Sequence, residues 1–252
     1  MRSSFCRLQT DFAKEKHLPY ATPALSANRI RHTGGRDSVS LAEKAGKDGR
    51  SVKDLVLYIH GKGGNVAEAE HYKPLFAGAD VVGLSYRSQT PWEAKEEFPP
   101  LVENLRAGHG KVTLIANSIG AFFAMNALSG RQIDRALFLS PIVDMEKLIR
   151  DMMAQANVTE ADLRQRREIP TESGETLSWA YLTYVRSNPT VWQVPTSVLY
   201  GERDFLTSQE TISAFAEKCG ATLTIVPGGE HWFHTEEQMR ALDAWICAEI
   251  GR

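Results

Sequence analysis

Short apolar runs alternate with longer amphipathic segments from residue 52 to the end of the chain. Six of the runs consist mainly of β-branched and other apolar residues, as expected for strands covered on both faces of a sheet. They span residues 55–59, 81–85, 112–116, 136–139, 197–200 and 223–226. The segments between them repeat apolar residues at helical spacing. This alternation predicts an α/β fold, with a mostly parallel sheet flanked by helices.

Helix start signals precede four of the amphipathic segments. In each, a residue that can cap a helix is followed three positions later by Glu or Gln, which is the spacing of a capping box. These pairs are Asn65 with Glu68, Thr90 with Glu93, Thr207 with Glu210, and Thr235 with Gln238. Because proline breaks a helix interior, we expect the second helix to stop and restart at Pro99 and Pro100.

Residues 140–196 form a connection that is too long for a single crossover helix. We interpret residues 144–192 as a small helical lid inserted after the sixth strand of the expected sheet. Methionine, leucine and isoleucine recur in it at helical spacing, which favours packing, although methionine-rich faces also suit apolar ligands. We therefore expect a single domain, residues 1–252, with its core at about 52–250. Residues 39–41 are a candidate edge strand, and residues 1–25 are not placed.

Composition favours one large core and a small-molecule partner. The 252 residues are 42% hydrophobic and 24% charged, with a formal net charge of -2. That balance is ordinary for a globular protein and includes no concentrated basic face for nucleic acid. No apolar stretch is long enough to span a membrane, and the first residues do not resemble a signal peptide. The three cysteines lack metal-like spacing, so we expect a cytoplasmic protein without structural disulfides. The oligomeric state is left open.

Ser118 occupies an unusual position for a polar residue. A buried strand ending near Ala116 runs directly into an almost wholly apolar helix that starts near Gly120. A sharp strand-to-helix turn needs small neighbours and presents its central side chain at the carboxyl edge of the sheet. The alternative is a serine that merely caps the helix.

This segment resembles the nucleophile elbow of the α/β-hydrolase family, with Ala116 in place of the first glycine of G-x-S-x-G. The resemblance implies that Ser118 is the nucleophile and that the amide of Ile119 is one oxyanion-hole donor. An upstream strand followed by His60, Gly61, Lys62, Gly63 and Gly64 is similar to the family's oxyanion loop. By that likeness the second donor is the amide of Lys62, with Gly61 as the alternative, and His60 supports the loop.

Two later loops complete the resemblance. Asp204 follows the strand at 197–200 with the family's strand, glycine, x, x, Asp spacing, which implies that it is the catalytic acid. His231 follows the last strand in G-x-x-H and H-x-F contexts, which implies that it is the catalytic base. Asp144 is the alternative acid, and His234 is the alternative base. The order Ser118, Asp204, His231 is the one expected of this fold.

The resemblance covers residues 52–250 and implies an eight-stranded sheet with its site at the carboxyl ends of the strands. It implies a serine hydrolase that cleaves small-molecule carboxylic esters through a covalent acyl-enzyme, with no metal or organic cofactor. An aminopeptidase, amidase or acyltransferase on the same scaffold is the enzymatic alternative. A non-catalytic ligand receptor is the alternative from another class, since one fold hosts many functions.

Overall fold

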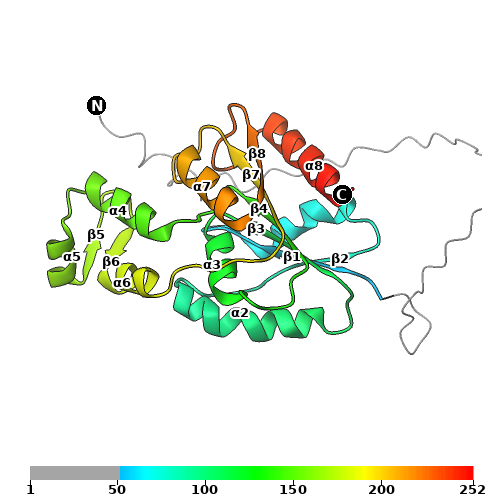
Figure 1. The fold of residues 1–252 in the computed structure, drawn as a ribbon, viewed down its shortest axis with the longest axis horizontal. Helices are drawn as coiled ribbons and strands as arrows, with labels where there is room; N and C mark the ends of the chain where they lie inside the picture. The colour runs from blue at the N-terminus through cyan, green and yellow to red at the C-terminus, as the bar shows by residue number, and fades with distance from the viewer. Residues whose placement is uncertain (1–51, 252) are drawn as a thin grey trace, which may run out of the picture.

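A six-stranded sheet forms the centre of the protein in the computed structural model, which describes residues 52–251 (Figure 1). Its strand order is β2-β1-β3-β4-β7-β8, and every neighbouring pair is parallel. The strands are β1 (Leu55–Ile59), β2 (Asp80–Gly83), β3 (Val112–Asn117), β4 (Arg135–Leu139), β7 (Thr196–Gly201) and β8 (Thr222–Val226). All six predicted strands are present. The eight strands of the resemblance are not all in the described part, and the candidate edge strand at 39–41 lies outside it.

Helices cover both faces of this sheet. One face packs against α2, α3 and α7, and the other packs against the 3-10 helix η1 and against α8. Their bounds are η1 (Val66–Leu75), α2 (Pro91–Arg106), α3 (Ile119–Ala127), α7 (Gln209–Cys219) and α8 (Glu236–Ile250). Successive side chains of a strand point to opposite faces. Within β1, Leu57 therefore packs with α2 and α3, whereas Tyr58 packs with η1 and α8.

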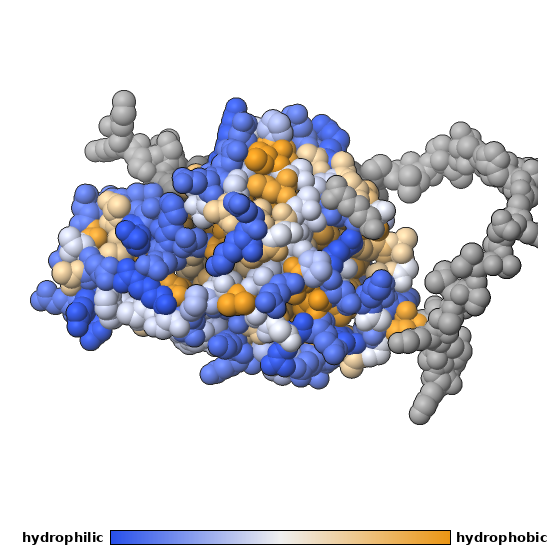
Figure 2. Space-filling view, viewed as in Figure 1, coloured by the Kyte–Doolittle hydropathy of each residue, from blue (hydrophilic) through white to orange (hydrophobic). Residues whose placement is uncertain are grey.

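The long connection between β4 and β7 lies beside the carboxyl edge of the sheet (Figure 1), and its buried residues join the same hydrophobic core as α2 and α3. Its elements are α4 (Met145–Gln155), α5 (Glu160–Arg166), β5 (Glu168–Pro170), β6 (Thr176–Ser178) and α6 (Trp179–Ser187). The segment predicted as a small helical lid contains three helices and also an antiparallel hairpin of β5 and β6, which the sequence pattern did not predict. Ile169 pairs with Leu177 in it, and both are buried. Figure 2 shows mainly hydrophilic side chains over this segment on the face in view.

Helix α2 runs through Pro99 and Pro100 without a restart, which corrects the sequence prediction. A proline inside a helix removes a backbone hydrogen bond and crowds the preceding turn. Here Phe98, Pro99 and Val102 are buried, and α2 packs along α3. Burial of this face outweighs the local penalty, so tertiary packing decides the length of the helix.

The predicted helix start at Thr207 is also wrong by one residue. Ser208 is the N-cap of α7, and its side chain accepts a hydrogen bond from the amide of Thr211. Thr207 is buried, and its amide and hydroxyl donate to Asp204 Oδ1 and to the carbonyl of Pro141. These contacts hold Thr207 in the loop before α7, so its hydroxyl does not cap the helix. The other three predicted caps, Asn65, Thr90 and Thr235, are confirmed.

Candidate active site

Ser118 joins β3 to α3 in a strained backbone conformation. Its φ of 53° and ψ of -124° lie outside the regions that L-residues ordinarily occupy. The turn is held from both sides, since the amide of Ser118 donates to the carbonyl of Leu139 and its carbonyl accepts from the amide of Ile142. Ala116, which departs from the family's glycine, is fully buried within β3. A methyl group therefore fits at that position.

The elbow and the loop after β1 lie in close contact. A Cβ atom added at Gly120 would stand 2.3 Å from the carbonyl oxygen of His60, and one added at Gly61 would stand 3.1 Å from Ser118 Cβ. The first distance is too short for any side chain. Glycine at position 120 is thus required for the loop to approach the start of α3.

Ser118, His231 and Asp204 form a continuous chain of hydrogen bonds. Ser118 Oγ lies 2.9 Å from His231 Nε2, and His231 Nδ1 lies 2.7 Å from Asp204 Oδ2. The side chain of Asp204 is fully buried, and that of His231 is 10% exposed. An ionised carboxylate accepts hydrogen bonds but does not donate them, so it favours the tautomer that carries its proton on Nδ1. Nε2 is then free to accept the proton of the serine hydroxyl.

The loop that carries Asp204 is fixed by further hydrogen bonds. Asp204 Oδ1 accepts from the amides of Leu206 and Thr207, at 2.8 and 3.1 Å. The hydroxyl of Tyr200 donates to the carbonyl of Thr207 at 2.8 Å. Burial, and secondly the nearby Asp204 charge, raises the pKa of Tyr200 to about 12, so this hydroxyl keeps its proton at neutral pH. The carboxylate thus has a defined orientation.

The histidine loop packs directly on the acid loop at Gly201. A Cβ atom at this position would stand 2.5 Å from the carbonyl oxygen of Glu230 and 2.6 Å from that of Gly229. The amide of Arg203 donates to the same Gly229 carbonyl at 2.7 Å. These contacts bring His231 to Asp204 although 27 residues separate them.

The alternative acid and base have other partners. Asp144 is the N-cap of α4, where its Oδ1 accepts from the amide of Lys147 at 2.9 Å. The ring of His234 is bonded to the carbonyl of Trp232 at 2.7 Å and stacks on the Trp232 indole. The hydrogen bonds of the structure therefore favour Asp204 and His231 over Asp144 and His234.

The loop at residues 60–64, called here the oxyanion loop, begins in a tight turn. The amide of Gly64 and Nδ1 of His60 both bond to the carbonyl of Gly61, at 3.1 and 2.8 Å. The His60 ring stacks on Tyr86, whose hydroxyl donates to the His60 carbonyl at 2.8 Å. His60 thus supports the loop as expected. Ile119 opens α3 directly after Ser118, and the assignment of the second donor to Lys62 stays a prediction.

The sequence patterns did not place Glu68, Phe205 or Trp232 beside the site, although Glu68 was predicted as the capping-box partner of Asn65. Glu68 lies behind the oxyanion loop, where it accepts from the hydroxyl of Tyr58 at 2.6 Å and from the amide of Asn65 at 3.1 Å. Phe205 and Trp232 directly follow the candidate acid and base and are 59% and 46% exposed. The Phe205 ring is centred 6.1 Å from that of His231. The sequence signal that could have placed Phe205 and Trp232 near the site was their position directly after Asp204 and His231.

Comparison with solved structures identifies the fold of the chain. No protein-family model matches the chain, and no curated protein matches its sequence. Est1E from Butyrivibrio proteoclasticus matches with a TM-score of 0.64 and 15% identity, over 81% of this chain and 89% of its own. Alpha/beta hydrolase domain-containing protein 10 from mouse matches with a TM-score of 0.60 and 14% identity, over 78% and 89%. A monoacylglycerol lipase from Paleococcus ferrophilus matches with a TM-score of 0.50 and 17% identity, over 77% and 94%.

The chain has the α/β-hydrolase fold. In this α/β-hydrolase fold, Ser118, Asp204 and His231 follow β3, β7 and β8, so all three lie at the carboxyl edge of the sheet. Ligands of open α/β sheets bind outside that edge.

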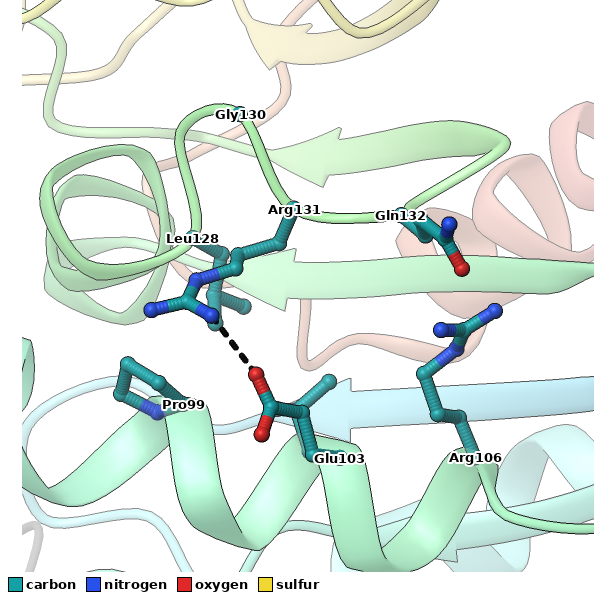
Figure 3. A pocket seen from close by; sticks show the side chains of 8 residues that line it. Pro99, Glu103, Arg106, Leu128, Gly130, Arg131 and Gln132 are labelled. Carbon is teal, nitrogen blue, oxygen red and sulfur yellow. Dashed lines mark hydrogen bonds and ion pairs between the residues drawn. The ribbon is translucent and has the colours of Figure 1, made fainter.

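A cavity of about 320 Å³ lies elsewhere in the α/β-hydrolase fold, between α2 and the connection from α3 to β4 (Figure 3). Arg131 donates to Glu103 across it at 2.6 Å, and Arg106 and Gln132 lie beside them. These residues belong to the last turns of α2 and to the approach to β4. They therefore lie toward the amino edge of the sheet, away from Ser118.

Within residues 52–251, no helix is both long and apolar enough to cross a membrane. The same residues contain no group of three or more His, Cys, Asp or Glu side chains placed to hold a metal ion.

Proposed function

We propose that this protein is a serine hydrolase that cleaves carboxylic esters, with Ser118 as nucleophile, His231 as base and Asp204 as the acid that orients it. The observation that carries the proposal is the chain of two hydrogen bonds from Ser118 Oγ through His231 to Asp204, at 2.9 and 2.7 Å. Support also comes from the hydrolases and esterases that share the fold.

The reaction has two halves. His231 Nε2 takes the proton of Ser118 as its oxygen attacks the ester carbonyl, and the alcohol then leaves with that proton. Water attacks the resulting acyl-enzyme with the same histidine as base, and the acid product and free Ser118 are released. The amides of Ile119 and Lys62 stabilise the oxyanion in both halves. Each such donor is worth about 10²- to 10³-fold in kcat.

The chemistry of the site favours an acyl-transfer enzyme over a non-catalytic receptor, and the lipase that shares the fold supports esters as substrates. The same groups serve an amidase, an aminopeptidase or an acyltransferase, which differ in the leaving group or in the acceptor of the acyl group. A non-catalytic receptor has no need of an aligned serine and imidazole. Est1E has also been solved with ferulic acid bound, so hydroxycinnamate esters belong in the substrate panel.

Labelling with a fluorophosphonate tests the proposal without assuming a substrate. The purified protein should become tagged on Ser118, as located by mass spectrometry, and the Ser118→Ala variant should not. Turnover of p-nitrophenyl acetate or butyrate should be lost in the same variant. No tag on a folded sample would overturn the mechanism and support a receptor. Faster cleavage of an aminoacyl nitroanilide than of these esters would support a peptidase.

A further inference from the structure

The side chain of Lys62 joins the oxyanion loop to the inserted segment. Its Nζ forms an ion pair with both carboxylate oxygens of Glu175, which lies in the turn between β5 and β6. The two residues are 113 positions apart in the chain. The hairpin of the inserted segment therefore reaches the loop that carries the proposed oxyanion donor.

Glu175 is presented by a well-fixed turn. Its carbonyl accepts from both the amide and the hydroxyl of Thr171, at 2.8 Å each. The amide of Gly174 donates to the Thr171 carbonyl at 3.1 Å, and its φ of 83° suits glycine. The strands on either side are anchored by the buried pair Ile169 and Leu177. The position of the Glu175 carboxylate is thus set by the hairpin.

The oxyanion loop needs support from outside because three of its five residues are glycines, which lose much conformational freedom when ordered. Tyr86 holds one end through the His60 carbonyl, and Glu68 holds the residue just after the other end through the amide of Asn65. Lys62 lies between these ends, and its side chain is anchored by Glu175. The ion pair therefore acts at the centre of the loop.

We propose that Glu175 is a positioning residue for the oxyanion hole, which couples the inserted hairpin to the amide of Lys62. This inference rests on the proposed function and deepens it, because it makes the rate of acyl transfer depend on where the inserted segment lies. An oxyanion donor that is displaced stabilises the transition state less, while ground-state binding of the ester changes little. The loss should therefore appear in kcat rather than in KM.

The expected effect is small and sensitive to salt. The side chains of Lys62 and Glu175 are 64% and 25% exposed, and exposed ion pairs are weak and screened by ions. Breaking the pair should lower kcat by about two- to five-fold at low ionic strength. That is far less than the ~10²-fold or greater loss expected when a donor is removed. The difference from wild type should shrink as salt is added.

The experiment compares four variants of the full chain. Glu175→Gln and Lys62→Met each break the ion pair while keeping the Lys62 amide, and the double exchange Lys62→Glu with Glu175→Lys restores it with reversed charges. Asp151→Asn is the matched control, because it breaks the exposed Lys147 to Asp151 pair of the same inserted segment, 2.6 Å long. The measurements are kcat and KM for p-nitrophenyl butyrate at low and high salt, the rate of fluorophosphonate labelling, and hydrogen exchange of the loop amides.

We expect lower kcat, slower labelling and faster exchange in residues 60–64 for both single variants, recovery in the double exchange, and wild-type behaviour in the control. Unchanged kcat and unchanged loop exchange in folded single variants would overturn the inference. So would equal losses in the control. If wild type is neither labelled nor active but its loop exchange still responds to Glu175→Gln, the proposed function fails and the link between hairpin and loop is upheld.

Discussion

Replacing Asp204 with asparagine should reverse the hydrogen bonding of His231 without changing the shape of the acid loop. Two backbone amides, those of Leu206 and Thr207, donate to Oδ1. An asparagine at position 204 must keep its carbonyl oxygen there to accept from them. Its NH₂ group then takes the place of Oδ2, which lies 2.7 Å from His231 Nδ1. Two donors cannot face each other, so the imidazole must carry its proton on Nε2.

This tautomer presents a donor instead of an acceptor to Ser118 Oγ, 2.9 Å away. The serine proton then has no base, and the imidazolium has no carboxylate to stabilise it. We expect kcat to fall by about 10⁴-fold, the size of loss that a wrong tautomer causes in a serine triad. This corresponds to about 5 kcal/mol of activation free energy. The free energy of unfolding should change little, because the side chain at position 204 keeps its hydrogen bonds from the amides of Leu206 and Thr207.

The assay measures kcat for p-nitrophenyl butyrate and the rate of fluorophosphonate labelling, with circular dichroism and thermal unfolding as tests of folding. Asp144→Asn is the matched control, since it makes the same chemical change at the alternative acid. Asparagine caps helices as well as aspartate does, so α4 should be preserved and kcat should remain at the wild-type level. A folded Asp204→Asn variant with kcat within about tenfold of wild type would refute the reasoning, as would a larger loss in the control.

Three further predictions concern stability. Gly120→Ala places a Cβ atom 2.3 Å from the His60 carbonyl oxygen and should cost about 1–3 kcal/mol or more in urea unfolding. Gly251→Ala, at a residue whose φ is -77° and whose added Cβ atom would come no closer than 3.7 Å to a surrounding atom, should cost less, and equal losses would contradict this. The Tyr181 hydroxyl is buried without a hydrogen-bond partner among the described residues, so Tyr181→Phe should leave stability unchanged or raise it by up to about 1 kcal/mol; a clear loss would oppose it. The pKa of Tyr200 is raised to about 12, above its ordinary value of about 10, so its neutral form contributes stability that is complete below pH ~10 and is lost as pH rises toward 12. Tyr200→Phe should flatten the decline of unfolding free energy across that window, and an unchanged slope would contradict the assignment.

The sheet and the relative positions of three polar residues could be predicted from the sequence because their signals are local. Each strand is a mostly apolar run, and parallel strands place their carboxyl ends at one edge of the sheet. Ser118, Asp204 and His231 each follow such a run, so their proximity follows from the topology. The structure places them within hydrogen-bonding distance in a chain, and their roles in catalysis remain our proposal.

The errors have tertiary causes. Proline penalises a helix locally, but burial of Phe98 and Val102 keeps α2 continuous through Pro99 and Pro100. Thr207 has the spacing of a helix cap, yet contacts with Asp204 and Pro141 draw it into the preceding loop. Both competing interactions involve buried groups whose partners the local pattern does not reveal.

The contact between Lys62 and Glu175 could not be predicted from the sequence, although both residues lie in segments that the sequence patterns identify. The proposed oxyanion loop is apparent from its glycines, and because glycines carry no side chain, only His60 and Lys62 can fix its shape through side chains of its own. Part of its support comes from a hairpin of two three-residue strands. Those strands are too short for an apolar period of two to be distinguished from a helical pattern. Its register is set by the buried pair of Ile169 and Leu177, and that register decides which residue of the turn reaches the loop. A shift by one position would direct Glu175 elsewhere and break its ion pair with the Lys62 side chain. Under our proposal, selection for acyl transfer at Ser118 should therefore also act on the pairing of this hairpin, which is distant from Ser118 in the sequence.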